Sequence, residues 1–326
     1  MEVVPLRSPL CDLVGIDVPI IQAGMSIFTS PSLAAAVSEA GALGSLGAWN
    51  RRTDQHREAL AELRDLTGRP FAVNHVVPDL DEDAFAATLE CAPAIISFAL
   101  DDAGDLMRRA HDAGSLVMQQ INTVQQAQVA AEHGADIIVA QGGEAGGYGG
   151  TVSTVSLVPQ VVDAVRPLPV VAAGGIADGR GIAAALVLGA AGVNLGSRFL
   201  ASAESPVGER WKKALITYPS QDWIQSRFIN ALNPNPGTVG YGTSLRLLRT
   251  EYVQRWEDRT SEVAADPGPA LAELADAVAA GDREDLLVVG GQSAGLIQRI
   301  EPAASIVRTL VAETRDALTE AADYQI

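Results

Sequence analysis

The sequence predicts an α/β protein, a (β/α)8 barrel of the TIM type with a mainly helical insertion after the eighth strand. Three observations predict this fold. Eight apolar runs of strand length alternate with segments whose apolar residues recur at helical spacing. The runs are continuously apolar, as is typical of parallel strands that are covered on both faces. Eight strand-helix units are the number that closes a barrel.

The expected elements can be placed in order along the chain. The eight strands are expected at residues 18–24, 42–48, 70–77, 94–100, 115–121, 135–142, 169–175 and 191–199. Helical spacing is clearest at residues 30–41, 103–114, 123–134 and 178–189, and most of these segments end in the glycine that a left-handed helix cap favours. An open doubly wound sheet is the alternative, but the loop "IIQAGMSIFTS" lacks the G-x-G-x-x-G of a dinucleotide fold.

The strand-helix rhythm stops near Pro206. Residues 206–285 contain helix-like segments, three of the four tryptophans and no clear strand. Amphipathic spacing resumes at residues 294–320, which predicts the closing helix of the barrel. We therefore expect a barrel formed by residues 1–205 and 286–326, and a mainly helical, substrate-side domain formed by residues 206–285.

Composition and charge narrow the function classes. The chain has 326 residues, 48% of them hydrophobic, and a net charge of −17. An acidic chain of this kind is a poor partner for nucleic acid or an anionic membrane, because both require a basic face. The two cysteines, Cys11 and Cys91, have no metal-ligand spacing, so no metal site is expected. With no signal-peptide pattern and no apolar run of about 20 residues, we expect a cytoplasmic protein.

Glycine-rich loops follow the last three expected strands, at "AQGGEAGGYGG" (140–150), "AAGGIADGRG" (172–181) and "NLGSRF" (194–199). Glycine lets backbone N–H groups approach a ligand, and the loops after strands seven and eight form the usual phosphate site of such barrels. We also expect the first turn of the helix after residue 178 to face the anion. Tight turns without a ligand are the alternative. The residues expected at the phosphate are Gly174, Gly175, Gly196 and Ser197.

Several stretches in the expected order resemble the nitronate monooxygenase family, formerly called 2-nitropropane dioxygenases. They include "PIIQAGMSIFTSPSLAAAVSEAG", "FAVN", "AQGGEAGGYGG", "VVAAGGIADGRGIAAALVLGAAGVNLGSRF" and "GGQSAGLI", and the resemblance spans about residues 10–320. It implies an FMN-dependent oxidoreductase that oxidises alkyl nitronates with O2. Related flavin barrels include an enoyl-acyl-carrier-protein reductase and flavin-dependent NAD(P)H oxidoreductases.

The resemblance also implies which residues surround FMN at the top of the barrel. Besides the phosphate residues, they are Ala23, Gly24, Met25, Asn74, Gln119, Gln141, Gly142, Gly147, Gln292 and Ser293. Asn74 and Gln119 are expected to hydrogen-bond the polar edge of the flavin ring. A satisfied asparagine at a strand end is the alternative for Asn74, since burial without partners is costly. His75 is expected on the opposite face of its strand, among the helices. Gly24 stands where many family members have proline.

Tyr148 stands where the nitronate-oxidising members usually have a histidine after "EAGG". A histidine with a pKa near 6.5 can take a proton from a nitroalkane, whereas a tyrosine with a pKa near 10 is a poor base and a good donor. Oxidation of an already formed nitronate is then one expectation. The alternative is an NAD(P)H-dependent enzyme acting on a quinone, enone or acyl thioester, with Tyr148 as proton or hydrogen-bond donor. Tyr148 could also simply cover the flavin.

Further assignments stay open from the sequence alone. Glu144 is the second catalytic candidate, with fixing its own loop as the alternative, and Trp211 and Tyr241 are candidates for shaping the substrate pocket. A non-catalytic phospholigand-binding barrel is a third function class. The sequence leaves open the substrate, the electron acceptor, the use of NAD(P)H and the oligomeric state, for which a homodimer is one alternative.

Overall fold

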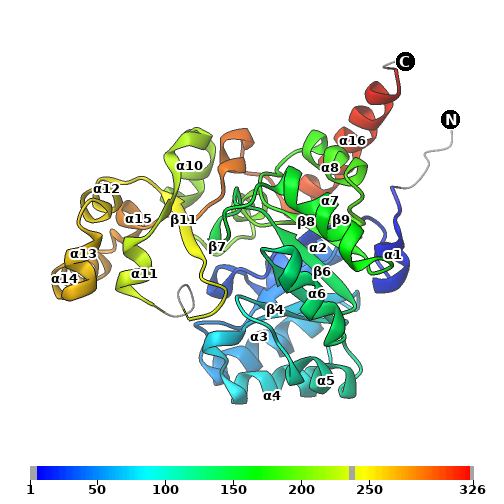
Figure 1. Ribbon diagram of the computed structural model, residues 1–326, viewed down its shortest axis with the longest axis horizontal. Coiled ribbons are helices and arrows are strands. Elements are labelled where there is room, and N and C mark those ends of the chain that lie inside the picture. Colours follow the sequence, from blue (N-terminus) through cyan, green and yellow to red (C-terminus); the bar gives the residue numbers. More distant parts are fainter. Residues whose placement is uncertain (1–5, 235–238, 324–326) are drawn as a thin grey trace.

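The computed structural model describes residues 6–234 and 239–323. The two ends of the predicted barrel, residues 1–5 and 324–326, and residues 235–238 of the predicted insertion lie outside the described residues. Figure 1 shows a barrel with the segment from α10 to α15 forming a lobe at one side of it. Helix α1 and the carboxyl end of α16 lie on the opposite side of the barrel from this lobe.

The barrel sheet contains eight parallel strands in the order β1-β9-β8-β6-β5-β4-β3-β2. A parallel bridge between Ile21 and Leu43 joins the two outer strands, and the Gln22 N–H donates to the Leu43 carbonyl at 2.9 Å. The sheet therefore closes, and all eight predicted strands are confirmed. Their bounds are Ile20–Gln22 (β1), Gly44–Gly47 (β2), Phe71–Val76 (β3), Ile95–Ala99 (β4), Leu116–Ile121 (β5), Ile137–Gln141 (β6), Val170–Ala173 (β8) and Gly192–Leu195 (β9).

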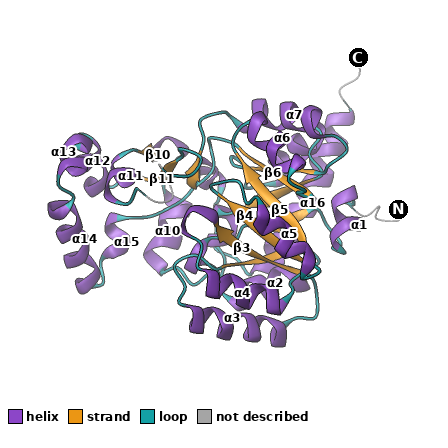
Figure 2. Cartoon of the chain, turned by 60° about the horizontal axis from the view of Figure 1, so that its bottom comes forward, coloured by secondary structure: helices purple, strands orange, loops and turns teal. Residues whose placement is uncertain are grey.

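Helices cover the outside of the barrel (Figure 2). The barrel helices are α2 (Pro31–Glu39), α3 (Thr53–Leu66), α4 (Glu82–Cys91), α5 (Asp105–Asp112), α6 (Val124–Glu132), α7 (Thr154–Val165), α8 (Gly179–Val187), α9 (Ser197–Leu200) and α16 (Ala303–Ala322). The short helix α1 (Pro9–Val14) precedes the first strand, and its Leu10, Cys11 and Val14 pack into the cluster of strand side chains inside the barrel. In the described part of the chain, no helix is long and apolar enough to cross a membrane.

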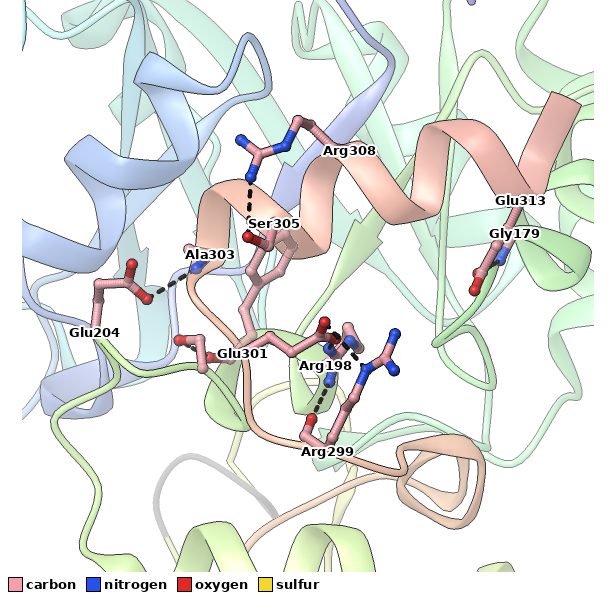
Figure 3. Close-up of polar contacts among 11 residues, drawn as sticks. Gly179, Arg198, Glu204, Arg299, Glu301, Ala303, Ser305, Arg308 and Glu313 are labelled. Carbon is pink, nitrogen blue, oxygen red and sulfur yellow. Dashed lines mark hydrogen bonds and ion pairs between the residues drawn. The ribbon is translucent and has the colours of Figure 1, made fainter.

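The closing helix begins later than the amphipathic pattern indicated. The expected segment started at residue 294, whereas α16 starts at Ala303 and a 3-10 turn, η4, occupies Gln292–Leu296. Pro302 explains the difference, because a proline inside a helix removes a backbone donor and clashes with the preceding turn. The side chain of Glu204 accepts a hydrogen bond from the Ala303 N–H at 2.9 Å, which fixes the start of α16 (Figure 3).

The insertion contains strands that the sequence analysis did not find. Its helices are α10 (Glu209–Thr217), α11 (Phe228–Leu232), α12 (Glu251–Glu257), α13 (Thr260–Ala265), α14 (Gly268–Ala280) and α15 (Arg283–Leu286). Two strands, β10 (Trp223–Ser226) and β11 (Ser244–Leu248), pair antiparallel, and β11 also pairs with β7 (Gly147–Gly149) from the glycine-rich loop. The expectation of no strand was wrong, because these short strands are stabilised by partners far away in sequence. The domain boundaries at residues 206 and 285 stay a prediction.

Two buried histidines share one threonine behind the barrel sheet. The Nε2 atoms of His56 and His75 each lie 2.9 Å from the Thr88 hydroxyl, which itself donates to the Ala84 carbonyl. Because that hydroxyl has only acceptor positions left, both histidines donate from Nε2. Burial lowers the pKa of His56 to about 4 and of His75 to about 3. His75 therefore packs among the helices as a neutral residue, as predicted.

These pKa shifts predict an acid-sensitive fold. Above about pH 6.5 both histidines are neutral in the folded and in the unfolded protein. Below that pH, they take up protons in the unfolded protein but stay neutral in the folded one. Stability should therefore fall as the pH drops from about 6.5 toward 4, by up to about 1.4 kcal/mol per pH unit for each histidine. Urea unfolding of wild type and of His56→Gln should show a shallower pH dependence for the variant. His111→Gln, at an exposed position on α5, is the control, and equal slopes for all three proteins would contradict the prediction.

Candidate active site

A cavity of about 430 Å³ lies at the carboxyl ends of the barrel strands, beside the insertion. Five of the strands each contribute a residue with a carboxamide side chain to the cavity lining, namely Gln22, Asn74, Gln120, Gln141 and Asn194. Parallel strands bring these ends together at one rim, although the residues are far apart in sequence. We call these five residues the carboxamide rim. Their side chains carry hydrogen-bond donors and acceptors without any net charge. The Gln22 carboxamide is committed within the protein, since it accepts from the Ser45 N–H at 2.9 Å and donates to the Ala23 carbonyl.

The structure brings most of the sequence-predicted site residues together at this cavity. Those that line it are Ala23, Gly24, Met25, Asn74, Gln141, Gly147, Tyr148, Gly174, Gly196, Ser197 and Ser293. Trp211 also lines the cavity, whereas Tyr241 packs against the main barrel core. The residues expected at the cavity that do not line it are Gln119, Gly142, Glu144, Gly175 and Gln292.

The assignment of Gln119 is corrected by one residue. Its side chain is fully buried on the helix side of β5, where it donates to the Asp101 carbonyl at 3.0 Å and accepts from the Ala103 N–H at 3.3 Å. Successive strand residues point to opposite faces, so its neighbour Gln120 faces the cavity instead. The motif resemblance located the strand end, but the strand alternation decides which glutamine can touch a ligand.

Glu144 fixes its own loop and does not face the cavity. Its carboxylate accepts hydrogen bonds from the Thr154 N–H and hydroxyl at 2.9 Å each, at the start of α7. Its backbone carbonyl accepts from the Gln292 N–H at 2.9 Å. The neighbouring glycines serve the same packing: a Cβ at Gly142 would lie 2.1 Å from the Thr154 hydroxyl, and one at Gly175 would lie 3.4 Å from the Glu144 side chain. Glu144 is therefore withdrawn as a catalytic candidate.

The expected anion site at the start of α8 is also corrected. The Asp178 carboxylate accepts from the Gly181 N–H at 3.1 Å, and the Glu313 carboxylate accepts from the Gly179 N–H at 3.0 Å (Figure 3). Acidic side chains already bind these amides, and none of the four residues lines the cavity. Of the four residues expected at a phosphate, Gly174, Gly196 and Ser197 remain. The Ser197 hydroxyl accepts from the Gly291 N–H at 2.8 Å, so its own proton is free to be donated to a ligand.

The glycine-rich loop is held from two sides. On one side, Gly147–Gly149 forms the third strand of the sheet with β10 and β11. On the other side, Gly146 packs backbone to backbone, and a Cβ there would lie 2.6 Å from the Gly290 carbonyl carbon and the Gly291 nitrogen. Only glycine permits so close an approach.

Buried Arg246 braces this loop, and the sequence analysis missed it. Its guanidinium donates to the Trp223 carbonyl at 2.6 Å and to the Gly143 carbonyl at 2.5 Å. Burial lowers the pKa of Arg246, while nearby Glu144 opposes that shift. An arginine in "SLRLL" carries no visible signal for this role, because both acceptors are backbone carbonyls distant in sequence.

Tyr148 projects from the loop into the cavity wall. It is only 7% exposed and packs against Leu100 and Leu245, with the ring of Trp49 edge-on at 6.5 Å. Burial raises the pKa of Tyr148 to about 12. Its hydroxyl makes no hydrogen bond to any other residue that the structure describes. Tyr148 therefore remains protonated at neutral pH, as an uncommitted donor.

Two buried polar atoms at the cavity have no partner within the described part of the chain: the Ser45 hydroxyl and the Asn194 side-chain oxygen. Leaving such atoms unpaired is costly, and a ligand with a polar edge would satisfy them. Gly24 keeps the approach open, since a Cβ there would lie 2.8 Å from the Ser45 hydroxyl oxygen. These features fit a ligand with a polar edge, such as a flavin.

Some cavity residues that the sequence analysis missed have a recognisable sequence pattern. Gln22, Gln120 and Asn194 each stand near the end of an apolar strand, where an uncharged polar residue needs a partner. Ser45 and Ser97 are small polar residues inside apolar strands and give a weaker signal. The wall contributed by the insertion gives none, because its apolar residues look like ordinary core.

A closed parallel barrel whose mouth combines an uncharged polar rim with glycines is compatible with a flavin-dependent oxidoreductase. Comparison with known families agrees with this class. The nitronate monooxygenase family model matches residues 7–91 and 83–313. The chain belongs to the nitronate monooxygenase family.

Individual relatives carry different names. A Mycobacterium tuberculosis protein named (3aS,4S,5R,7aS)-5-hydroxy-7a-methyl-1-oxo-octahydro-1H-indene-4-carboxyl-CoA dehydrogenase is 36% identical over 77% of this chain and 69% of its own length. A probable nitronate monooxygenase of Staphylococcus aureus is 30% identical over 94% of this chain and 96% of its own. The structure of FabK from Thermotoga maritima superposes with a TM-score of 0.87 at 34% identity, covering 98% of this chain and 99% of that one.

Removal of the Arg246 brace should destabilise the protein. Arg246→Gln removes the charged guanidinium that donates hydrogen bonds to the Gly143 and Trp223 carbonyls. A hydrogen bond to a charged group contributes about 1.5–3 kcal/mol to the free energy of unfolding. We expect the free energy of unfolding, measured by urea denaturation, to fall by about 3 kcal/mol. Arg249→Gln, an exposed position just after the same strand, should change it by less than about 0.5 kcal/mol. Equal effects of the two substitutions would contradict the bracing role.

Proposed function

We propose that the protein is an FMN-dependent nitronate monooxygenase-like enzyme that oxidises alkyl nitronates which arrive already ionised. The observation that carries this proposal is the chemistry of the cavity wall. Among its described residues, the only ionisable side chains are Tyr148 and Arg283. Neither is a base at neutral pH, because burial holds Tyr148 protonated and an arginine does not deprotonate. The wall therefore offers no group to remove a proton from a neutral nitroalkane.

Different groups of cavity residues would hold different parts of the FMN cofactor. Gly174, Gly196 and Ser197 would receive the phosphate, and the carboxamide rim would face the polar edge of the ring. When bound, the flavin supplies the electron transfer from substrate to O2. The uncharged rim tolerates changes of charge on the ring without placing a fixed counter-charge beside it.

Tyr148 would bind and orient the anionic substrate. An uncommitted phenol hydroxyl at the cavity wall can donate to a nitronate oxygen, and a hydrogen bond to a charged acceptor is roughly twice as strong as a neutral one. The apolar neighbours of Tyr148 exclude water from that bond, which strengthens it further. The histidine of other members can act as a base; this chain keeps only the donor function.

A second candidate is an FMN-dependent reductase or dehydrogenase that uses NAD(P)H or its oxidised form and acts on a quinone, enone or acyl thioester. The apolar wall that the insertion contributes to the cavity favours it, since a small nitronate would leave this wall uncovered. The carboxyl-CoA dehydrogenase name of the M. tuberculosis relative supports it as well. Tyr148 would then donate a proton or a hydrogen bond. A cytoplasmic location and the oligomeric state stay predictions.

The test is anaerobic mixing of the purified protein with three compounds in parallel: propionate-3-nitronate, the corresponding neutral nitro compound and NAD(P)H. We expect the nitronate to bleach the visible flavin absorbance and the neutral compound to react at least about a hundredfold more slowly, since no base is present. With preformed nitronate, kcat/KM should be flat between about pH 6 and 9, because no group in the wall titrates there. Bleaching by NAD(P)H alone would replace the proposal with the second candidate.

Tyr148→Phe isolates the hydroxyl. We expect the variant to retain its flavin, because the ring still packs against Leu100 and Leu245, and to lose about tenfold or more in kcat/KM for nitronate. Trp49→Phe, which alters the same wall without touching the hydroxyl, is the matched control. An unchanged kcat/KM in Tyr148→Phe would remove the donor role.

A further inference from the structure

The insertion contributes an apolar side to the active-site cavity, whereas the carboxamide rim is polar. We call this side the apolar compartment. Its residues come from α11, β11, α14 and the segment after α15: Ile229, Leu232, Leu245, Leu247, Leu271, Leu274, Leu287 and Val289. Leu271 is 43% exposed, although a large apolar side chain gains most by burial. Ile229 and Leu247 are already buried in the core of the insertion, and a hydrocarbon group in the cavity would cover the side chains of this set that remain partly exposed.

The compartment has one charged residue, Arg283, at the start of α15. Within the described residues Arg283 has no ion-pair partner, and its guanidinium lies 5.9 Å over the ring of Phe28. Three other arginines of the insertion, Arg210, Arg255 and Arg259, each pair with a carboxylate at 3.0 Å or less, whereas none of Arg227, Arg246 and Arg249 has such a partner among the described residues, and none of these three lines the cavity. What distinguishes Arg283 is its position, because it is the one permanently charged side chain among the described residues that line the cavity.

The carboxylates next to Arg283 in sequence are all engaged elsewhere. Asp282 and Asp285 both bind Arg210 at 2.8 Å. Glu284 accepts from the Gly208 N–H at 2.8 Å and the Trp211 N–H at 3.2 Å. The local acidic groups are thus held away from Arg283, which leaves its five N–H donors available to an anion from outside the protein.

We propose that the substrate is an extended amphiphilic anion, whose hydrocarbon body occupies the apolar compartment and whose anionic group binds Arg283. The inference rests on the proposed function for the position of the reacting group, which lies at the carboxamide rim and Tyr148. The anionic group has two chemical sources, a carboxylate of the substrate itself or a phosphate of a thioester carrier. Arg283 and the apolar compartment then determine specificity, while the rim and Tyr148 serve the reaction.

Calorimetric titration of the holoprotein with non-reacting probes tests this inference. The probes are acetate, hexanoate and decanoate, with decanol as the uncharged analogue and decanoyl-coenzyme A as the phosphate-bearing one. Affinity should rise about threefold to fourfold for each added methylene group that is buried. Decanol should bind at least about tenfold more weakly than decanoate, because it offers no charge to Arg283. Tighter binding of decanoyl-coenzyme A indicates the phosphate source, and tighter decanoate binding the carboxylate source.

Two exposed positions allow variants that keep the fold. Arg283→Gln should weaken decanoate at least about tenfold. The matched control Arg227→Gln, exposed in the same insertion but outside the cavity, should leave it unchanged. Leu271→Ser should weaken decanoate severalfold and leave acetate unchanged. Absence of binding by both decanoate and decanoyl-coenzyme A, or equal effects of the two arginine substitutions, would overturn the inference.

Failure of this inference is distinguishable from failure of the proposed function. If decanoate binds in an Arg283-dependent way but no nitronate bleaches the flavin, the inference stands and the nitronate proposal fails. If nitronates bleach the flavin but chain length and Arg283 have no effect on binding, the nitronate proposal stands and the inference is wrong.

Discussion

The pairing of Gly147–Gly149 with Ser244–Arg246 is the interaction on which the active site depends. It makes the glycine-rich loop after β6 the edge of a small antiparallel sheet whose other strands belong to the insertion. Loop and insertion therefore form one wall, with Tyr148 directly opposite Leu245 in the register. Glycines are needed in the loop because it also meets Gly290 and Gly291 backbone to backbone. Without this pairing, the barrel mouth would have neither Tyr148 in place nor an apolar side.

The cavity wall is rich in uncharged polar groups but poor in charged ones. The carboxamide rim and the serines beside it can hydrogen-bond a ligand, yet the described wall contains only one permanent charge, Arg283. A site of this kind favours flavin chemistry, in which the cofactor changes its charge and the protein supplies orientation. The low polarity around Tyr148 acts in the same direction, because it keeps the phenol protonated.

A buried ion pair holds the segment that precedes α16 against the barrel. Arg198 follows Ser197, and its guanidinium binds Glu301 at 2.8 Å and the Arg299 carbonyl at 3.1 Å (Figure 3). The segment between Gly290 and Glu301 is thereby held against the loop after β9, while Gly291 itself donates to Ser197. Burial lowers the pKa of Arg198 and Glu301 opposes that shift. The start of α9 and the segment from Gly290 to Glu301 are thus tethered to each other.

The sequence by itself determined the barrel, its eight strands, the position of its mouth and the family. Each of these depends on local apolar runs, on glycine spacing or on contiguous motifs, which are present in the chain before it folds. The tertiary structure decided the rest. The alternation of side chains along β5 places Gln120, and not Gln119, at the cavity. A carboxylate binds the first backbone amide of α8, and the Glu144 carboxylate hydrogen-bonds Thr154. Strands β10 and β11, Arg246 and the apolar compartment arise from contacts between distant segments. Side-chain direction and non-local pairing carry no local signature, because they are set by what the rest of the chain places nearby.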